Sequence, residues 1–275
     1  MLQSKLMSST DGHLSIAGDE TPMGATRPAV VIPTYNEAEN IGRLVQRILD
    51  VVPNMQVIVV DDNSPDGTGI LADALAAEDE RVHVVHRPGK LGLGTAYVAG
   101  FREAFSLNAD PICTMDADFS HDPSYLPALL EKAQVYDVSI GSRYVPGGGT
   151  KHWGLKRRVL SRGANWVART LLGLEAHDCT AGFRAYRRHV LEAVHPETVR
   201  ADGYSYLVEI LYRCQFLGFS IGEVPIIFVD RLRGNSKISQ KEILKAAFTV
   251  GRLFIRRLLR LSPVSRATRV GPRPS

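Results

Sequence analysis

The sequence has 275 residues, 44% of them hydrophobic and 23% charged, with a formal net charge of +4. These values are typical of a globular protein with one large domain or two small ones. No apolar run approaches the roughly 18 residues that a membrane-spanning helix needs, so we expect no integral membrane protein. The three cysteines, Cys113, Cys179 and Cys214, form no close pair, which favours a reducing compartment.

The first 26 residues are rich in serine, threonine, glycine and acidic side chains. They contain no apolar stretch long enough for the core of a signal peptide. We therefore expect residues 1–26 to be a disordered leader that precedes the folded part of the chain.

Short apolar runs then alternate with segments of helical periodicity. The predicted strands are AVVI at 29–32, QVIVV at 56–60, VHVVH at 82–86 and PICTM at 111–115. After the first strand, a buried helix face is indicated by Ile41, Leu44, Val45, Ile48 and Val52. Continuous apolar strands separated by helices are typical of an α/β fold, with a mostly parallel sheet and helices on both faces.

The second half of the sequence is less regular. A glycine-rich loop at 141–154 leads into a predicted helix from about 155 to 172. A second predicted helix covers 204–217, and a strand at 221–229 and a polar loop follow it. No internal repeat and no linker divides the chain, so we expect one domain over residues 27–238.

Polar clusters follow three of the predicted strands, in PTYNEAEN (33–40), VVDDNSPDGT (59–68) and MDADFSHDP (115–123). Ligands of open parallel sheets bind beyond the carboxyl ends of the strands, so we expect these clusters to act together. The adjacent acids Asp61 and Asp62 can accept hydrogen bonds from a ribose or a base. Asp116 and Asp118 form a D-x-D motif, whose oxygen ligands suit Mg²⁺ or Mn²⁺ shared with a diphosphate.

The glycines in GKLGLGTAYVAG (89–100) resemble a dinucleotide-binding loop, because they follow a strand and open a helix. Their spacing differs from G-x-G-x-x-G, since Tyr97 stands where the third glycine would be. The loop also follows the third strand rather than the first. We therefore do not expect NAD as a cofactor.

Seven segments occur in the order found in the polyprenyl-phosphate (dolichyl-phosphate) mannose synthases of glycosyltransferase family 2. They are VVIPTYNEAENI, VVDDNSPDGT, RPGKLGLGTAYVAGF, MDADFSHDP, GSRYVPGG, TAGFRAYRR and FVDRLRGNSK. The sequence resembles this family over about residues 29–240. The resemblance implies a GT-A fold and the transfer of mannose from GDP-mannose to a polyprenyl monophosphate. The Q-x-x-R-W motif of the family's polysaccharide synthases is not found, which argues against polymer synthesis.

The resemblance also implies that the domain over 27–238 is the catalytic domain, and it implies roles for individual residues in it. It assigns the guanosine nucleotide pocket to Pro33, Tyr35, Glu37 and Asp62, with Val60 nearby. It assigns contacts with the sugar nucleotide to Asp116, Ala117, Asp118, Arg143, Arg231 and Lys237, the last three touching phosphate. It assigns Mg²⁺ or Mn²⁺ to Asp116, Asp118 and Ser120, and catalysis to Asp118, Arg143 and Arg231.

In the implied reaction the lipid phosphate is already anionic, so its oxygen can attack the anomeric carbon without a strong general base. The metal and the basic side chains offset the charge that develops on the departing GDP. A single displacement inverts the anomeric centre and gives a β-mannosyl phospholipid. The hexose cannot be read from one sequence, so transfer of glucose or another sugar stays open, as does an inactive sugar-nucleotide sensor.

Positive charge is concentrated at the C-terminal end. Residues 231–275 hold 12 lysine and arginine residues against one acid, whereas residues 1–230 hold 21 against 28. A helix over 239–261 would gather five basic side chains within about 100° and place its apolar side chains on the other side. Such a helix can lie on an anionic membrane surface. The alternative is that it packs its apolar side on the domain.

Residues 262–275 are expected to be a disordered tail. The C-terminal segment lacks aromatic platforms and recognition motifs, so we do not expect nucleic-acid binding. The expected location is the cytoplasm, with the protein bound peripherally to the cytoplasmic face of the membrane. A membrane-protein partner is a further expectation.

Overall fold

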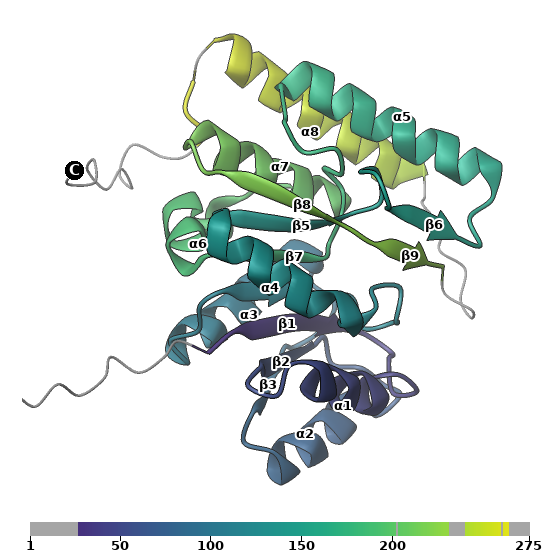
Figure 1. The fold of residues 1–275 in the computed structure, drawn as a ribbon, viewed down its shortest axis with the longest axis vertical. Helices are drawn as coiled ribbons and strands as arrows, with labels where there is room; N and C mark the ends of the chain where they lie inside the picture. The colour runs from purple at the N-terminus through teal and green to yellow at the C-terminus, as the bar shows by residue number, and fades with distance from the viewer. Residues whose placement is uncertain (1–26, 202, 231–239, 260, 264–275) are drawn as a thin grey trace, which may run out of the picture.

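Figure 1 shows the computed structural model, which describes residues 27–201, 203–230, 240–259 and 261–263. A seven-stranded sheet runs through the centre in the order β3-β2-β1-β4-β7-β5-β8, and β6 pairs with β9 in a second, two-stranded sheet. The strands are β1 Ala29–Thr34, β2 Gln56–Asp61, β3 Val82–His86, β4 Ile112–Thr114, β5 Val138–Ser142, β6 Gly149–Lys151, β7 Arg184–Tyr186, β8 Ile221–Pro225 and β9 Ile227–Val229. The predicted leader lies outside the described residues, as does the predicted tail from residue 264 on.

Helices cover both faces of the large sheet, as the sequence predicts. They are α1 Ile41–Val51, α2 Thr68–Glu78, α3 Leu93–Ser106, α4 Leu126–Val135, α5 Leu155–Leu172, α6 Arg188–Val194, α7 Tyr204–Phe216 and α8 Gln240–Leu258. One face carries α1, α2 and α4, and the other carries α3, α6 and α7. Beyond α7, α5 and α8 lie side by side in an outer layer at the top of Figure 1.

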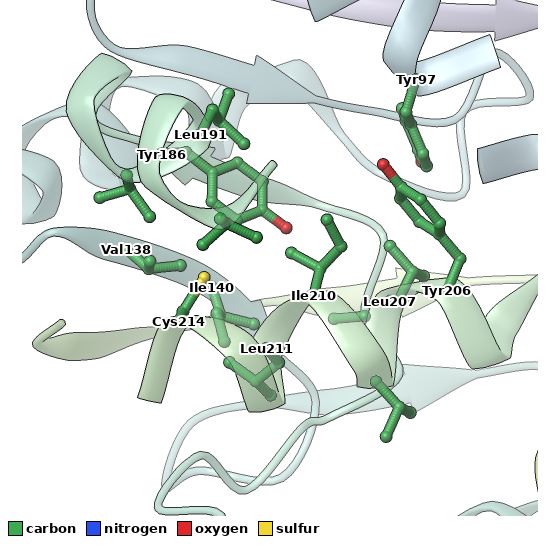
Figure 2. Close-up of a cluster of buried hydrophobic side chains, with 14 of the residues drawn as sticks. Tyr97, Val138, Ile140, Tyr186, Leu191, Tyr206, Leu207, Ile210, Leu211 and Cys214 are labelled. Carbon is green, nitrogen blue, oxygen red and sulfur yellow. The ribbon is translucent and has the colours of Figure 1, made fainter. Parts of the chain in front are cut away.

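The strands divide the hydrophobic core into two parts because their side chains alternate between the two faces. In β1, Val30 and Ile32 belong to the core under α1 and α4, whereas Val31 belongs to the core under α3 and α7. Figure 2 shows the second core, in which Leu207, Ile210, Leu211 and Cys214 of α7 gather near β5. Burial on both faces explains why these strands read as unbroken apolar runs.

The close packing of α3 on β1 depends on a glycine. A Cβ atom at Gly100 would lie 2.2 Å from Cγ1 of Val31. No ordinary side-chain movement accommodates such a distance without moving the helix or the strand. The glycine therefore sets how near α3 approaches the sheet.

The four strands predicted in the first half are confirmed as β1 to β4, and the two predicted helices of the second half are confirmed as α5 and α7. The single strand predicted at 221–229 is wrong, because it breaks at Ile226 into β8 and β9. The Ile226 amide donates to the Ser142 carbonyl, and its carbonyl accepts from Gly149. The chain thereby leaves the large sheet and pairs with β6, which lies inside the predicted glycine-rich loop.

The basic helix predicted over 239–261 is observed as α8, Gln240–Leu258. Its inner side packs on the domain through Val250 and Leu253, which belong to the same core as α7. Arg252 also turns inward and bonds to the buried Glu209 of α7. The predicted separation of a basic from an apolar side is therefore only partly observed, because Arg252 lies on the inner side with Val250, whereas Phe248 and Leu258 of the predicted apolar side face outward. In the described part of the chain, no helix is long and apolar enough to cross a bilayer.

Candidate active site

Three loops meet at one edge of the sheet because three parallel strands end there. Thr34 at the end of β1 stands opposite Asp61 at the end of β2, and Val31 stands opposite Thr114 at the end of β4. The loops that follow these strands carry the three polar clusters of the sequence. Their predicted proximity is therefore a consequence of the parallel register.

The loops after β1 and β2 are hydrogen-bonded to each other along their length. The backbone amide of Glu37 donates to Oγ1 of Thr68 at 2.9 Å, and the amide of Ala38 donates to Oδ2 of Asp66 at 3.0 Å. Tyr35, at the rim of this pair of loops, is partly exposed, and Nζ of Lys90 lies 4.5 Å from its ring centre. An aromatic face beside a cation, held on a rigid rim, suits a planar anionic ligand such as a nucleotide.

Asp62 forms a buried ion pair with Arg87, whose Nη1 lies 2.7 Å from Oδ1 of the carboxylate. Burial raises the pKa of Asp62, and the nearby Arg87 guanidinium opposes this effect. The neighbouring Asp61 accepts hydrogen bonds from Thr34 and from Ser64, and so holds the start of the loop. Arg87 thus fixes the position of a predicted nucleotide contact.

Two of the predicted binding residues contribute little side-chain surface. Val60 and Ala117 are both buried in hydrophobic cores, and the Val60 carbonyl accepts a hydrogen bond from Thr34. Pro33 is half-buried near the end of β1. Val60 and Ala117 therefore have almost no surface with which to contact a ligand, whereas Tyr35 is exposed and Glu37 is half-buried.

The D-x-D motif turns sharply directly after β4. Phe119 has a φ of +60°, in the left-handed region. Oδ1 of Asp118 accepts hydrogen bonds from the backbone amide of Ser120 at 3.0 Å and from its hydroxyl at 2.6 Å. Ser120 is buried, and its hydroxyl is a donor to Asp118 in this geometry. The serine therefore orients the second aspartate of the motif.

The buried His121 contacts the backbone of Asp116, the first aspartate of the motif. Its ring stacks on Phe183 with centroids 5.0 Å apart, and Nδ1 accepts the backbone N–H of Asp116 at 3.2 Å. Burial lowers the pKa of His121, although the Asp116 and Asp118 carboxylates oppose this shift. A neutral ring that accepts at Nδ1 carries its proton on Nε2. His121 thereby fixes the backbone at Asp116.

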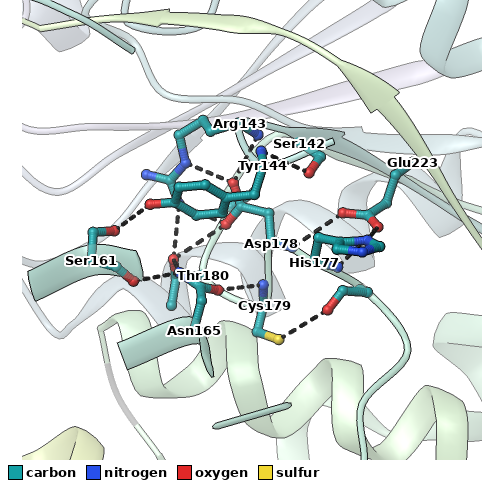
Figure 3. A network of polar contacts seen from close by, with 12 residues as sticks. Ser142, Arg143, Tyr144, Ser161, Asn165, His177, Asp178, Cys179, Thr180 and Glu223 are labelled. Atoms are coloured by element: carbon teal, nitrogen blue, oxygen red, sulfur yellow. Dashed lines mark hydrogen bonds and ion pairs between the residues drawn. The ribbon is translucent and has the colours of Figure 1, made fainter. Parts of the chain in front are cut away.

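Figure 3 shows Arg143, at the start of the loop after β5, held by Asp178. Nε and Nη2 of Arg143 each donate to a carboxylate oxygen of Asp178 at 2.6 Å, and Nη2 also donates to Thr180. Burial alone would lower the pKa of Arg143, but Asp178 outweighs it and the pKa is raised. Burial likewise opposes ionisation of Asp178, yet Arg143 holds its pKa below the ordinary value. The pair is ionised at neutral pH.

Asp178 reaches this edge of the sheet because β7 runs against its neighbours. An antiparallel strand begins at the edge where parallel strands end, so the loop before β7 lies beside the loops after β4 and β5. Arg184 in β7 is wholly buried and donates to the carbonyls of Cys179 and Ala181 in that loop. The loop that holds Arg143 is therefore anchored from within the core.

Known proteins resemble this chain over most of its length. A model of the family "Glycosyl transferase family 2" matches residues 29–194. The polyprenol monophosphomannose synthase of Mycolicibacterium smegmatis is 48% identical over 232 residues, which cover 84% of this chain and 88% of that protein. The chain belongs to glycosyl transferase family 2. The undecaprenyl-phosphate mannosyltransferase of Micrococcus luteus is 46% identical over 82% of this chain and 93% of its own length.

Solved structures confirm the GT-A fold of this family 2 chain. Glucosyl-3-phosphoglycerate synthase from Mycobacterium tuberculosis, solved with Mn²⁺, UDP-glucose and phosphoglyceric acid, superposes with a TM-score of 0.60 at 20% identity. The match covers 84% of this chain and 80% of that one. The same enzyme solved with Mg²⁺ and UDP gives a TM-score of 0.59 over 85% and 79%. At this identity the likeness is one of fold.

The residues of this family 2 site fit a divalent cation shared with a ligand. Asp116 and Asp118 place two half-buried carboxylates on one turn. Among the described residues, no group of three or more acidic, histidine or cysteine side chains forms a complete metal site. Mg²⁺ is usually held by one or two carboxylates, with substrate phosphates and water completing its shell. The donor set fits that mode of binding.

The site of this family 2 chain differs in part from the sequence prediction. Arg231 and Lys237 lie outside the described residues, so their predicted contacts stay predictions. Three side chains were missed, namely Arg87, His121 and Asp178. Arg87 stands directly after the third predicted strand, much as Asp61 and Asp62 stand directly after the second. His121 lies inside the segment MDADFSHDP, and Asp178 lies just before the segment TAGFRAYRR. Each of these side chains makes its contact either with a residue distant in the sequence or with a backbone group, and a short sequence motif shows neither kind of contact.

Proposed function

We propose that this chain transfers mannose from GDP-mannose to a polyprenyl monophosphate, giving a β-mannosyl phospholipid. The observation that carries the proposal is the 48% and 46% identity, over more than four-fifths of the chain, with two proteins named for this class of transfer. The site supports it, because a D-x-D turn and a buried arginine meet at the edge where the polar loops gather.

The donor nucleotide is proposed to lie against the loops after β1 and β2. Tyr35 would stack on the base, and Glu37 and Asp62 would accept hydrogen bonds from the base and ribose. Pro33 and Val60 would form the floor beneath them. Asp62 is suited to this role because Arg87 holds its carboxylate in one position.

The reacting groups are proposed to lie between Asp118 and Arg143. A bound Mg²⁺ or Mn²⁺, held by Asp116 and Asp118 with Ser120 orienting Asp118, would offset charge on the diphosphate. Arg143, with Arg231 and Lys237 from the loop after β9, would contact the donor and acceptor phosphates. Because the acceptor phosphate is anionic, these side chains chiefly need to align it with the anomeric carbon. Fixed positive groups suit that task better than flexible ones.

The test is a transfer assay with the full chain, Mg²⁺, a polyprenyl phosphate and separately labelled GDP-mannose, GDP-glucose, UDP-glucose and UDP-galactose. We expect label in the lipid extract from GDP-mannose alone, with β configuration by NMR. Label from another donor would identify a different hexosyltransferase. Nucleotide binding without any lipid product would identify a sensor and overturn the proposal.

Membrane docking is proposed to use the outer layer formed by α5 and α8. Leu155, Val159 and Trp166 lie on one face of α5, and Trp166 is 67% exposed. On α8, Phe248 and Leu258 are 74% and 71% exposed. Apolar side chains of this size gathered on two adjacent helices mark an interaction surface rather than a solvated one. Exposed arginines of α5 border this surface, as on helices that lie in an anionic bilayer interface.

Sedimentation with anionic vesicles tests this docking surface. Trp166→Ser and Leu258→Ser should weaken vesicle binding and transfer to long-chain acceptor, while nucleotide binding stays intact. Ile70→Ser is the matched control, since Ile70 is 76% exposed on α2 at the other end of the sheet. Unchanged vesicle binding in both α5 and α8 variants would point to a membrane-protein partner or to another surface.

A further inference from the structure

A second polar hollow lies outside the site described above, between α7, α8 and the short turn Pro196–Thr198. Its volume is about 290 Å³. The polar side chains that line it include Thr198, Arg200, Glu209, Arg213, Arg252 and Arg256. None of these belongs to the D-x-D turn or to the Arg143 network. The hollow is therefore spatially separate from the candidate active site.

The charges around this hollow do not balance. Four arginines surround it, and Glu209 is the one carboxylate among its lining residues. Glu209 is buried and already accepts from Arg213 at 2.9 Å and from Arg252. Both of its oxygens are thus engaged. The lining carries an excess of three positive charges in a partly enclosed space, where repulsion between like charges is screened less than at the surface.

Two arginines that line the hollow have an N–H donor without a good acceptor, although Nη1 and Nη2 of one of them, Arg213, are bonded to carbonyls, Thr198 and Glu209. Nε of Arg213 is buried and has no hydrogen-bond partner among the described residues. Among the described residues, the side chain of Arg256 makes one hydrogen bond, a 3.5 Å contact of Nη1 with the Ser262 carbonyl at the outer limit of such bonds. An unsatisfied buried donor is costly. An anion with several acceptor oxygens would relieve both the repulsion and the missing bonds.

We infer that this hollow binds a phosphate group, and that the group belongs to an anionic phospholipid headgroup. Guanidinium groups match phosphate oxygens in geometry and charge, which favours phosphate over a halide or a single carboxylate. The lipid assignment rests on the proposed docking of α8. Arg252 and Arg256 lie three residues before Ile255 and Leu259, which are exposed apolar side chains, and residues at this spacing are neighbours on a helix. The hollow thus borders the exposed apolar side chains of the proposed docking surface.

Thermal unfolding of the full chain with inorganic phosphate tests the anion site without a membrane. Phosphate also stabilises proteins by exclusion from their surface, so the readout is the difference between variants at constant ionic strength. We compare Arg200→Gln and Arg256→Gln with Arg158→Gln, an exposed arginine on α5 outside the hollow. Wild type and the control should show a saturable rise in Tm, and the two hollow variants should lose it. Arg200 is exposed, so its variant should fold even if the other does not.

Vesicle binding identifies the source of the phosphate. Each arginine near an anionic surface contributes about fivefold, so the control Arg158→Gln/Arg162→Gln should bind phosphatidylglycerol vesicles about 30-fold more weakly. Arg200→Gln/Arg256→Gln should lose more than this, because it removes a headgroup site as well as two charges. A loss no larger than the control's, with the phosphate effect intact, would assign the hollow to soluble phosphate and overturn the lipid assignment. If the hollow variants keep the saturable rise in Tm, the anion site itself is refuted. None of these measurements uses catalysis, so failure of the proposed transfer would leave them interpretable.

Discussion

Replacing Asp178 with asparagine is expected to destabilise the protein and to disable Arg143 at the same time. The Asp178 side chain is 0% exposed, that of Arg143 is 9% exposed, and two charge-assisted bonds of 2.6 Å join them. The amide introduced by the substitution would keep one acceptor oxygen but would lose the charge. The guanidinium would then be buried without a counter-ion. Breaking one partner of such a pair costs about 3–5 kcal/mol, which lowers Tm by about 6–20 °C for a chain of this size.

Urea unfolding and transfer kinetics measure the two consequences separately. We expect Asp178→Asn to lose about 100-fold in kcat/KM, since displacement of a positioned side chain by about 1 Å has effects of that order. Arg143→Met should abolish transfer in either background. The double variant Arg143→Met/Asp178→Asn should be at least as stable as Asp178→Asn alone, because the uncompensated charge is gone.

If Asp178→Asn loses less than about 1 kcal/mol, the value of an exposed pair, then Asp178 does not hold Arg143 as a buried counter-ion. The same conclusion would follow if the two single effects on stability added in the double variant, because additivity would mean that the two side chains do not depend on each other.

Asp118→Asn should lower kcat by about 100- to 1000-fold, because it removes a fixed charged group at a site where charge develops. The Tm of this variant should stay unchanged. Near-normal turnover at saturating Mg²⁺ would contradict the role proposed for Asp118. The stability difference between wild type and Asp178→Asn should be full at neutral pH and should shrink as the pH falls below 3.8, because the folded pKa of Asp178 lies below that unfolded value. A difference that persists undiminished under acid would show that its charge is not the source. Gly100→Ala should cost about 1–3 kcal/mol in urea unfolding, since the added Cβ meets Val31, whereas Gly42→Ala, whose added Cβ has nothing within 4 Å, should not.

The elements that sequence predicts well are those whose burial is uniform along their length. The strands β1 and β2 are buried on both faces, so their apolar runs leave little ambiguity. By contrast, β7 has three residues, and Arg184 within it is charged yet wholly buried. Its guanidinium donates to the carbonyls of Cys179, in the preceding loop, and of Leu207, in α7, and neither contact shows in the sequence, so the segment reads as a loop. Periodicity cannot reveal a strand of this length.

The same limit applies to the site. The position of Asp116 and Asp118 at the edge of the sheet could be predicted, because both stand in one short stretch directly after a predicted strand. Asp178 and Arg143 are 35 residues apart, and only the fold brings them together. The outward apolar face of α5 was also missed, because arginines interrupt it in the sequence. Which side chains of α5 share this outward face becomes clear only once the structure shows which side of the helix is buried.

The position of β7 also constrains how the protein is made. Among the described strands of the large sheet, β5 pairs only with β7 and β8, and β7 is the sole bridge between β4 and β5. A nascent chain therefore offers β5 no partner until residues 184–186 have left the ribosome, whereas β1 to β4 can pair as they emerge. Unpaired strand edges invite association with other chains. We expect β5 to be the segment that depends most on chaperones during synthesis, and chains arrested before residue 184 to aggregate more readily than those released after 230.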